Sequence, residues 1–585
     1  MALVGYPTYD GPSSKVLPPT PPLITDEVSA FMKWRPQFHL LASHGWMNDP
    51  CAVSYDPEER VYRVFYQWNP QSPFWDHICW GGAQSANLLD WTVSSDPVLS
   101  PEASYDGKGI FTGCTLPPSS GKQITIFYTS VSRLPIHYSL PYHIGSETLS
   151  MATSTDGGRT WARSKANPIL GPEHLADFNI TGWRDPFVTK WASMDKVMGR
   201  KEAGLYGLIS GGIRDTTPSC FLYDINPSDP TLWKFVGPLM KLECNYRPSR
   251  WSGDSGVNWE VANVLTYDQY DFLLISSEGG AVKRNGKQTR ASIWIAGSLQ
   301  ETTPVTMKYD FGGLFDHGDY YASNTFRDES LDNAIVAWGW IIEDALSDEL
   351  IARQNWSGSM SVPRVISVAV VNNVIGALHS PIDQLTNFKV VKSEDSYELT
   401  TLGVDVHPRY VSSLRERAVH HIVVPAVTFF RPGVVDCGVS STSWELETEI
   451  SVSSSPVQVG ILALHSANYS EQTRLVFSTD RETFTIDRSR SGNGKELHAY
   501  DAPHTLFTSR TSYGAEVVEK LKLHVLCDKS VIEVFLNGRT AVSARVYPDE
   551  ASSRISLFAE NLTGEAVEFS ETKLWYGITG KSSIE

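Results

Sequence analysis

Short β-type runs follow one another from about residue 37 to residue 400, and they constrain the fold more than any other feature of the sequence. Gly, Pro, Asp and Asn separate the runs, which include VYRVFYQWN, ITIFYTSVS, GLYGLISGG, YDFLLISS, ASIWIAGS, YYASNTF and NAIVAWGWI. Strands joined by short connections predict antiparallel sheet, and roughly 350 residues of such strands exceed one sandwich. A closed β-propeller is therefore expected, although no regular sequence repeat fixes the number of blades.

The chain changes character after this segment. In residues 401–421, which include HPRYVSSLRERAVHH, apolar residues recur at helical spacing behind Pro408, so this stretch predicts a helical linker. Residues 422–585 return to alternating strands with the turn spacing of a two-sheet sandwich. Within them, Asn537-Gly538 lies between two apolar runs and predicts a hairpin.

The first residues of the chain are rich in Pro, Ser and Gly and include KVLPPTPPL, which cannot form a core and is expected to lie over the surface. The sequence thus predicts an all-β protein in four parts: a Pro-rich segment (1–36), a propeller (37–400), a helical linker (401–421) and a β-sandwich (422–585).

Composition excludes several classes of partner. A net charge of −17 without a Lys/Arg block excludes nucleic acid. No apolar run approaches the roughly 20 residues that cross a bilayer, so we expect no membrane span. The seven cysteines are odd in number, scattered and without a CxxC pair, which argues against a disulfide framework or a zinc site. Because the start also lacks a signal-peptide pattern, a cytoplasmic location is favoured, with secretion after signal removal as the alternative.

Two Asp-Pro pairs stand out among five. Asx-Pro pairs are common turn formers, and Asp56, Asp96 and Asp229 lie in polar surroundings that indicate loops. Asp49 and Asp185 instead follow Gly-Trp pairs, and small or apolar residues follow their prolines. A propeller brings the innermost strand of each blade to a central channel, so these two aspartates could meet there.

Most sugar chemistry needs a further acid, and Glu260 is the better candidate. It is a single carboxylate within the apolar strand GVNWEVANVLTY, where burial is expected to raise its pKa and keep it protonated as a general acid. The alternative is Glu243, whose neighbours Arg247 and Arg250 would favour ionisation.

An ordered set of motifs carries a family resemblance. WMNDP at 46–50, FYQWNP at 65–70, FTG at 111–113, WRDPFV at 183–188 and NWEV at 258–261 resemble the successive motifs of glycoside hydrolase family 32, the invertases, inulinases and fructosyltransferases. Further matches, in family order to about residue 575, include YTSVSRLPIHYSLPY with GSET, WGWI, QNWSGSMSVPR and VIEVFLNGRTAVSARVYP. The segment YTSVSRLPIHYSLPY and DPCA in place of DPNG resemble the fungal branch that acts on sucrose and includes transfructosylating enzymes.

This resemblance implies a five-bladed propeller followed by a β-sandwich and a retaining mechanism. It implies that Asp49 is the nucleophile at C2 of a β-fructosyl unit and that Glu260 is the general acid and then the general base. Asp185 would stabilise the oxocarbenium-like transition state, with Arg184 restraining it. The substrate-binding residues implied are Trp46, Asn48, Gln67, Trp75, Phe111, Thr112 and Arg184.

The expected function is hydrolysis of sucrose, with transfer of fructosyl units to short fructo-oligosaccharides such as 1-kestose. An exo-acting inulinase or fructan exohydrolase is an alternative, and so is a catalytically silent carbohydrate-binding protein. Cys51 and Ala52 depart from the usual Asn-Gly, which leaves the leaving-group preference open. The histidines lack a close ligand pair and no phosphate loop is present, so we expect no metal and no cofactor. Edge strands of the sandwich could pair between chains, which leaves a homodimer open.

Overall fold

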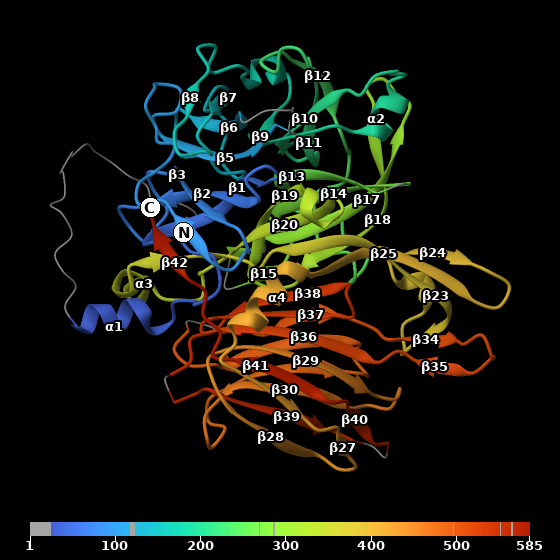
Figure 1. Cartoon of the computed structure of the whole chain (residues 1–585). Helices are drawn as coiled ribbons and strands as arrows, with labels where there is room; N and C mark the ends of the chain where they lie inside the picture. Colours follow the sequence, from blue (N-terminus) through green and yellow to red (C-terminus); the bar gives the residue numbers. More distant parts are fainter. Residues whose placement is uncertain are drawn as a thin grey trace.

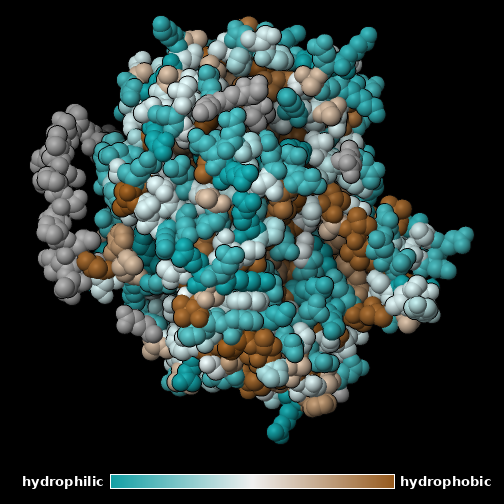
Figure 2. All heavy atoms as spheres, in the orientation of Figure 1, coloured by the Kyte–Doolittle hydropathy of each residue, from teal (hydrophilic) through white to brown (hydrophobic). Residues whose placement is uncertain are grey.

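The computed structural model describes residues 25–116, 123–267, 269–284, 287–494, 497–549, 551–562 and 565–585. The prediction of an all-β protein with an N-terminal propeller and a C-terminal sandwich is confirmed (Figure 1). Within the described residues, no helix is long and apolar enough to span a membrane. The viewed face is mainly hydrophilic, with separate hydrophobic patches, as Figure 2 shows.

The propeller contains five sheets whose main strands run antiparallel. The first is built from β1 (Gly45–Asp56), β2 (Val61–Asn69), β3 (Cys79–Ser85) and β4 (Trp91–Val93), with β21 (Trp356–Ser357) on β1. The second holds β5 (Gly109–Thr115), β6 (Ile124–Val131), β7 (Glu147–Ser154) and β8 (Ala162–Arg163). The third holds β9 (Ile180–Thr189), β10 (Leu205–Ile213), β11 (Thr217–Ile225) and β12 (Trp233–Pro238), and α2 (Ala192–Val197) follows β9.

The fourth sheet holds β13 (Asn258–Tyr267), β14 (Tyr270–Glu278), β17 (Ala291–Gln300) and β18 (Thr306–Asp316), and the short pair β15 (Lys283–Arg284) and β16 (Lys287–Gln288) lies between β14 and β17 in the chain. The fifth holds β19 (Tyr320–Asp328), β20 (Ala334–Ile341), β23 (Arg364–Ala377), β25 (Tyr397–Val406) and β24 (Lys389–Lys392), with β22 (Ser359–Met360) on β20. The first strands β1, β5, β9, β13 and β19 contact one another in cyclic order, so the sheets close into a ring.

Two sheets of the sandwich enclose a separate apolar core. One sheet runs β26 (His420–Val424), β41 (Thr572–Tyr576), β29 (Ser443–Ser451), β36 (Leu521–Asp528), β37 (Val531–Leu536) and β38 (Thr540–Arg545), with β40 (Val567–Phe569) and β27 (Val427–Phe429) at its side. The other runs β28 (Gly433–Ser440), β39 (Arg554–Glu560), β30 (Gln458–His465), β31 (Gln472–Ser478), β32 (Thr483–Arg490) and β33 (Tyr500–Pro503). Asn537 and Gly538 form the turn between β37 and β38, so the predicted hairpin is confirmed.

The predicted linker helix is shorter than the expected stretch of residues 401–421. Helix α4 spans Pro408–Arg417 with proline in its first turn, and His407 Nδ1 accepts the backbone N–H of Arg409 at 3.1 Å. Residues 401–406 belong instead to β25, and residues 420–421 begin β26. Tyr410 and Leu414 are buried in the core that the two domains share. The helix therefore fixes one domain against the other.

Strands from the C-terminal half also complete sheets of the propeller, which the sequence analysis did not predict. In Figure 1, β34 (Phe507–Arg510) and β35 (Glu516–Val518) extend the fifth sheet from the edge of β23. The C-terminal β42 (Ser582–Ile584) pairs in parallel with β4 of the first sheet. Of the Pro-rich segment, residues 1–24 lie outside the described residues, and Thr25–Lys33 form α1, which contacts α3 (Asp348–Gln354).

Candidate active site

The site residues predicted from the sequence lie on the first strands of neighbouring propeller sheets. Asp49 is on β1, Asp185 on β9 and Glu260 on β13. Burial raises the pKa of Asp49, and the charge of Glu260 raises it further, so the two carboxyls are electrostatically coupled. The backbone N–H of Val261, next to Glu260, donates to Oδ2 of Asp185 at 3.2 Å. The structure therefore gathers three acids that are remote in the sequence.

A shift of register at the same level in every sheet places these side chains. Between its first and second strands, each sheet skips two residues of the first strand, an arrangement that bends a strand and redirects its side chains. The skipped pairs are Asn48-Asp49, Phe111-Thr112, Asp185-Pro186, Val261-Ala262 and Ala322-Ser323. Asp185, Val261 and Ala322 have φ values of 61°, 47° and 55°, a region that residues other than glycine rarely adopt. The fold thus holds strained backbone at the ring of bulges.

Hydroxyl side chains satisfy the backbone at three of the bulges. Each comes from the second strand of the preceding sheet and accepts a backbone N–H: Thr129 from Asp185 at 2.8 Å, Ser210 from Ala262 at 2.9 Å and Ser276 from Ala322 at 3.0 Å. Buried amides that are left without a partner are costly, so these hydroxyls help to maintain the bulged geometry.

Three polar side chains contact Asp49, and a fourth holds one of them. Asn48 Nδ2 donates to Oδ1 at 3.1 Å, and Thr112 Oγ1 donates to Oδ2 at 2.5 Å. Gln67 Nε2 donates to Thr112 Oγ1 at 2.7 Å and approaches Oδ2 of Asp49 at 3.4 Å. Trp46 Nε1 donates to Asn48 Oδ1 at 3.0 Å and so fixes that amide. Although Thr112 and Asn48 stabilise the carboxylate, burial raises the pKa of Asp49 to about 6.

Aromatic rings flank the polar residues around Asp49. Trp46 packs edge-on against Trp340, with ring centroids 5.5 Å apart. Trp75 and Phe111 make a similar contact at 5.8 Å, and Phe111 precedes Thr112 on β5. Such rings supply apolar walls beside the polar groups around Asp49. Gly45, before Trp46, has φ +75°, and a Cβ there would lie 2.1 Å from the carbonyl oxygen of Asn69, so the strand requires glycine at this position.

The sequence analysis expected burial to raise the pKa of Glu260 and keep it protonated, and this expectation is wrong. Arg184 donates to Glu260 Oε1 from Nε at 3.0 Å and from Nη2 at 2.8 Å, and Tyr321 donates to Oε2 at 2.8 Å. Burial alone would raise the pKa of Glu260, but the Arg184 charge and these hydrogen bonds outweigh it and lower the pKa below its ordinary value. Glu243, the alternative acid, is an exposed residue of the segment before β13.

The contacts of Arg184 also differ from expectation, since it was expected to restrain Asp185. Its Nε lies 4.0 Å from Oδ2 of Asp185, whereas its hydrogen bonds go to Glu260, to Glu147 Oε1 at 3.2 Å and to Glu278 Oε2 at 3.3 Å. Burial raises the pKa of Asp185 well above its ordinary value; Arg184 opposes this shift, while the charges of Glu260 and Asp49 add to it. Burial and the charge of Glu260 raise the pKa of Glu278 to about 7.

Sequence reasoning missed Glu147, Glu278 and Tyr321 as parts of this network. Glu278 ends the apolar run YDFLLISSE, so the signal that selected Glu260, a single carboxylate on an apolar strand, could also have found it. Glu147 lies in GSET, a motif of the resemblance, and Tyr321 lies in the β-type run YYASNTF. Nothing in either motif indicates which acid or base its side chain contacts.

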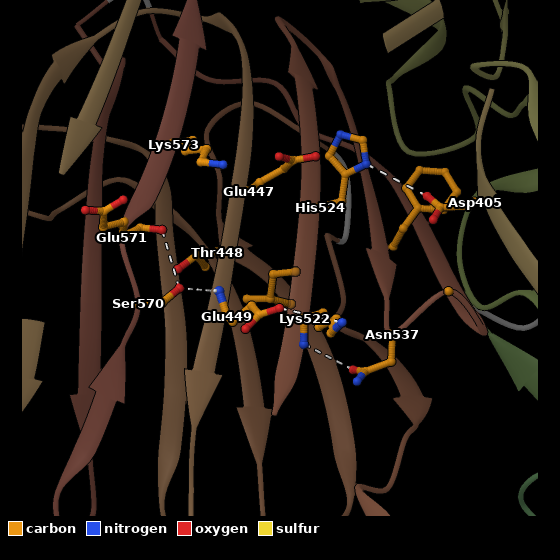
Figure 3. Close-up of a pocket in the computed structure, with 13 residues that line it drawn as sticks. Asp405, Glu447, Thr448, Glu449, Lys522, His524, Asn537, Ser570, Glu571 and Lys573 are labelled. Carbon is orange, nitrogen blue, oxygen red and sulfur yellow. Dashed lines mark hydrogen bonds and ion pairs between the residues drawn. The ribbon is translucent and has the colours of Figure 1, made fainter. Parts of the chain in front are cut away.

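A groove lies on the sandwich beside β25 (Figure 3), and none of these acids lines it. This groove has a volume of about 530 Å³, and its polar side chains bind one another. Lys522 Nζ lies 3.6 Å from Glu449, and the backbone N–H of Lys522 donates to Asn537 at 3.2 Å. Ser570 accepts the backbone N–H of Glu449 at 3.1 Å. The groove is thus lined by side chains that pair with one another, and the three acids assigned from the sequence are not among them.

One trio among the described residues has the spacing of metal ligands: Glu445, Glu447 and His524. Arg415 Nη2, however, lies 2.7 Å from Glu445 and 2.5 Å from Glu447. Burial lowers the pKa of His524, but bonding to Asp405 and Glu445 outweighs this and raises it to about 9. Because Arg415 binds both carboxylates and His524 Nε2 lies 2.9 Å from Glu445, this trio forms an ion-pair cluster.

Comparison with known proteins agrees with this architecture. The model of the glycosyl hydrolases family 32 N-terminal domain matches residues 39–376, and that of the family 32 C terminal matches residues 410–576. An insoluble beta-fructofuranosidase isoenzyme of Arabidopsis thaliana, CWINV6, is 26% identical, with 88% of this chain and 90% of the relative covered. A sucrose-6-phosphate hydrolase of Zymomonas mobilis is 26% identical, with 93% and 92% covered.

Solved structures show the same likeness. The Aspergillus kawachii beta-fructofuranosidase complexed with glycerol aligns with a TM-score of 0.84 at 26% identity and covers 97% of this chain and 98% of that one. The fructosyltransferase of A. japonicus aligns with a TM-score of 0.84 at 26% identity, with 96% and 98% covered. The two family models together span both domains, and the resemblance expected from the motifs is confirmed. The chain therefore belongs to glycosyl hydrolase family 32 and is a glycoside hydrolase.

Proposed function

We propose that this protein is a retaining β-fructofuranosidase that hydrolyses sucrose on a five-bladed propeller. The observation that carries the proposal is the clustering of Asp49, Asp185 and Glu260 on the ring of first strands, where the backbone N–H beside Glu260 binds Asp185 and the charge of Glu260 raises the pKa of Asp49. Five sheets whose first strands close a ring support the blade number. The relatives named beta-fructofuranosidase support the substrate.

In the first step, Asp49 attacks the anomeric C2 of the fructosyl unit while Glu260 protonates the departing glucosyl oxygen. The C2–O bond of sucrose breaks, and a bond from C2 to an Asp49 oxygen forms. Thr112, Gln67 and Asn48 orient the attacking carboxylate. Direct attack requires the two carboxyl groups to be roughly 5–5.5 Å apart.

Glu260 is suited to both of its roles by Arg184 and Tyr321. Because they stabilise the carboxylate form, the protonated acid gives up its proton readily as the leaving oxygen gains charge. In the second step, ionised Glu260 takes a proton from water, the water oxygen bonds to C2, and Asp49 is released. Asp185, held by Thr129 and Val261, would bind ring hydroxyls and stabilise the oxocarbenium-like state.

A fructosyl transfer activity is the second part of the proposal. It requires only that a sugar hydroxyl replace water in the second step, and the likeness to the fructosyltransferase of A. japonicus supports it. Product analysis over time at high sucrose should show oligosaccharides that grow at the expense of free fructose. Rates on inulin that exceed rates on sucrose would favour the exo-fructanase alternative.

Two substitutions test the roles. Asp49→Asn and Glu260→Gln should each reduce glucose release from sucrose by about 10⁴-fold or more, because each removes a group that acts directly in bond breaking. Glu243→Gln, at the exposed carboxylate, is the matched control and should retain wild-type activity. Retention is tested with methanol as acceptor, since it predicts methyl β-fructofuranoside. A folded Asp49→Asn variant with most of its activity, or the α-product, would contradict the mechanism.

A further inference from the structure

Glu147 is a carboxylate that the proposed reaction leaves without a role. It is the first residue of β7 in the second sheet, and it is fully buried. Both of its oxygens accept hydrogen bonds from β9 of the third sheet: Oε2 from the backbone N–H of Trp183 at 2.9 Å, and Oε1 from Arg184 Nη1 at 3.2 Å. One side chain thus binds both the backbone and the guanidinium of the segment that carries Asp185.

The hydrogen bond from Nη1 to Glu147 determines which edge of the Arg184 guanidinium faces Glu260. With Nη1 on Glu147, the opposite edge, Nε and Nη2, is directed at Glu260 Oε1. A planar guanidinium has its donors in a fixed fork, so holding one nitrogen restricts the direction of the others. Glu278, held in turn by Asn258 Nδ2 at 3.0 Å, accepts from Nη2 on the same side.

Gly182 provides the space in which the guanidinium lies. A Cβ at this position would be 2.4 Å from Nη1 of Arg184, a distance that real contacts do not reach, so any side chain there would displace the guanidinium. The φ angle of Gly182 is not of the left-handed kind, so the need for glycine here is steric. Both residues therefore act on Nη1 of Arg184: Glu147 attracts it, and Gly182 leaves the space that it occupies.

We propose that Glu147 is a positioning residue that, together with the space over Gly182, aims Arg184 at the general acid/base Glu260. The inference rests on the proposed function of Glu260 and adds to it a residue that touches neither substrate nor reacting atoms. An alternative is that Glu147 only neutralises a buried cation. Arg184 already has carboxylate partners in Glu260 and Glu278, so orientation is the property that Glu147 adds.

Glu147→Gln tests the proposal, since the amide keeps the size of the side chain but removes the charge that attracts Nη1. Misplacing a catalytic group by about 1 Å can cost 100-fold in rate, so we expect kcat on sucrose to fall about 10- to 100-fold while KM changes less than about 3-fold. A matched control is Asp106→Asn, which alters another fully buried carboxylate near the second sheet that binds the backbone N–H groups of Glu102 and Ala103. It should keep the wild-type kcat.

A double-mutant cycle separates positioning from simple stabilisation. If Glu147 acts through Arg184, Glu147→Gln should cost less than about 3-fold further in kcat when Arg184 is already lysine. An equal loss in both backgrounds would overturn the proposal. Gly182→Ala leaves all charges in place and should reproduce the loss of kcat; wild-type kcat in this variant would also overturn it, and this test holds even if Glu147→Gln does not fold.

A crystal structure of Glu147→Gln distinguishes failure of this inference from failure of the proposed function. Displacement of the Arg184 guanidinium from Glu260 supports positioning whatever the substrate is. An unmoved guanidinium refutes it, even if the wild-type enzyme hydrolyses sucrose. A wild-type protein that releases no glucose from sucrose would instead refute the proposed function and leave the structural readout intact.

Discussion

Thr112 donates its hydroxyl to Oδ2 of Asp49 over 2.5 Å, although the two residues belong to different sheets of the propeller. This contact and that of Gln67 favour the ionised nucleophile, yet burial still raises the pKa of Asp49 to about 6. Glu260 has a lowered pKa. With one proton on the pair, that proton therefore resides mainly on Asp49, whereas the reaction needs it on Glu260. The productive form is the minor one of two singly protonated states.

Thr112→Val should raise the pKa of Asp49 above about 6, because the variant loses a hydrogen bond that lowers it. Since Asp49 has the higher pKa of the pair, the basic limb of the kcat/KM profile should move to higher pH. The maximum should fall about 10-fold or more, because a still smaller share of the enzyme has Asp49 ionised. The profile is measured as initial rates of glucose release from sucrose. Thr112→Ser keeps the hydroxyl and should keep both limbs; a basic limb that stays in place in the valine variant would refute the argument.

Tyr321→Phe should shift the other limb. The phenol donates to Glu260 Oε2 at 2.8 Å and lowers the pKa of Glu260, so its loss raises that pKa. Glu260 has the lower pKa of the pair, and the acid limb of kcat/KM should therefore move to higher pH while the basic limb stays. Tyr206→Phe removes a comparable bond, from a buried tyrosine to Asp195 at 2.7 Å, outside the site and should change neither limb. Movement of the basic limb alone in Tyr321→Phe would contradict the pKa order of the pair.

Local sequence patterns predict the elements of this fold well because burial and turn chemistry are local. The run VYRVFYQWN coincides with β2, and Asn537-Gly538 makes the expected hairpin turn. The Gly-Trp pairs also distinguish Asp49 and Asp185 from the aspartates of ordinary Asp-Pro turns. Gly45 is required by a close approach of backbone to Asn69, and Gly182 by the guanidinium of Arg184.

The electrostatics of the site could not be predicted in the same way. Arg184, which reverses the pKa shift of Glu260, is 76 residues away in the sequence. The repeated bulges leave no sequence repeat, since the three that bind a hydroxyl need only one such residue on a neighbouring strand, Thr129, Ser210 or Ser276. The additions of β34 and β42 to propeller sheets depend on strand edges that only the tertiary structure exposes to them.

His39 should make stability depend on pH at the domain interface. This buried histidine lies between Asp528 at 2.8 Å and Glu533 at 3.1 Å, both of the sandwich. Burial lowers its pKa, but these carboxylates outweigh burial and raise it from 6.5 to about 8. A raised pKa means that the folded state binds the proton more tightly. The stabilisation is complete below about pH 6.5 and is lost as pH rises through about 8, and it amounts to about 2 kcal/mol.

Urea unfolding at pH 6 and pH 9 measures this contribution. His524, whose pKa is raised to about 9, adds its own pH dependence, so the comparison must be between wild type and His39→Gln. Between pH 6 and pH 9, the free energy of unfolding should fall by about 2 kcal/mol less in His39→Gln than in wild type. His420→Gln, at an exposed histidine of β26, should behave like wild type. Identical pH dependence in wild type and His39→Gln would show that the interface carboxylates do not hold the proton.

Arg364 should be among the most costly residues of the interface to replace. Its guanidinium is fully buried, contacts Glu533 of the sandwich at 2.5 Å and Asp316 of the fourth sheet at 2.9 Å, and lies 4.1 Å from the centre of the Tyr320 ring. Arg364→Met preserves most of the volume but leaves the buried Asp316 without its cation and leaves Glu533 with His39 alone. Breaking one side of a buried ion pair costs about 3–5 kcal/mol, and the free energy of unfolding in urea should fall by that amount. Arg554→Gln disrupts an exposed pair with Asp436 at 3.6 Å and should cost less than about 1 kcal/mol. A loss of similar size in both variants would mean that the buried network contributes no more than a surface ion pair.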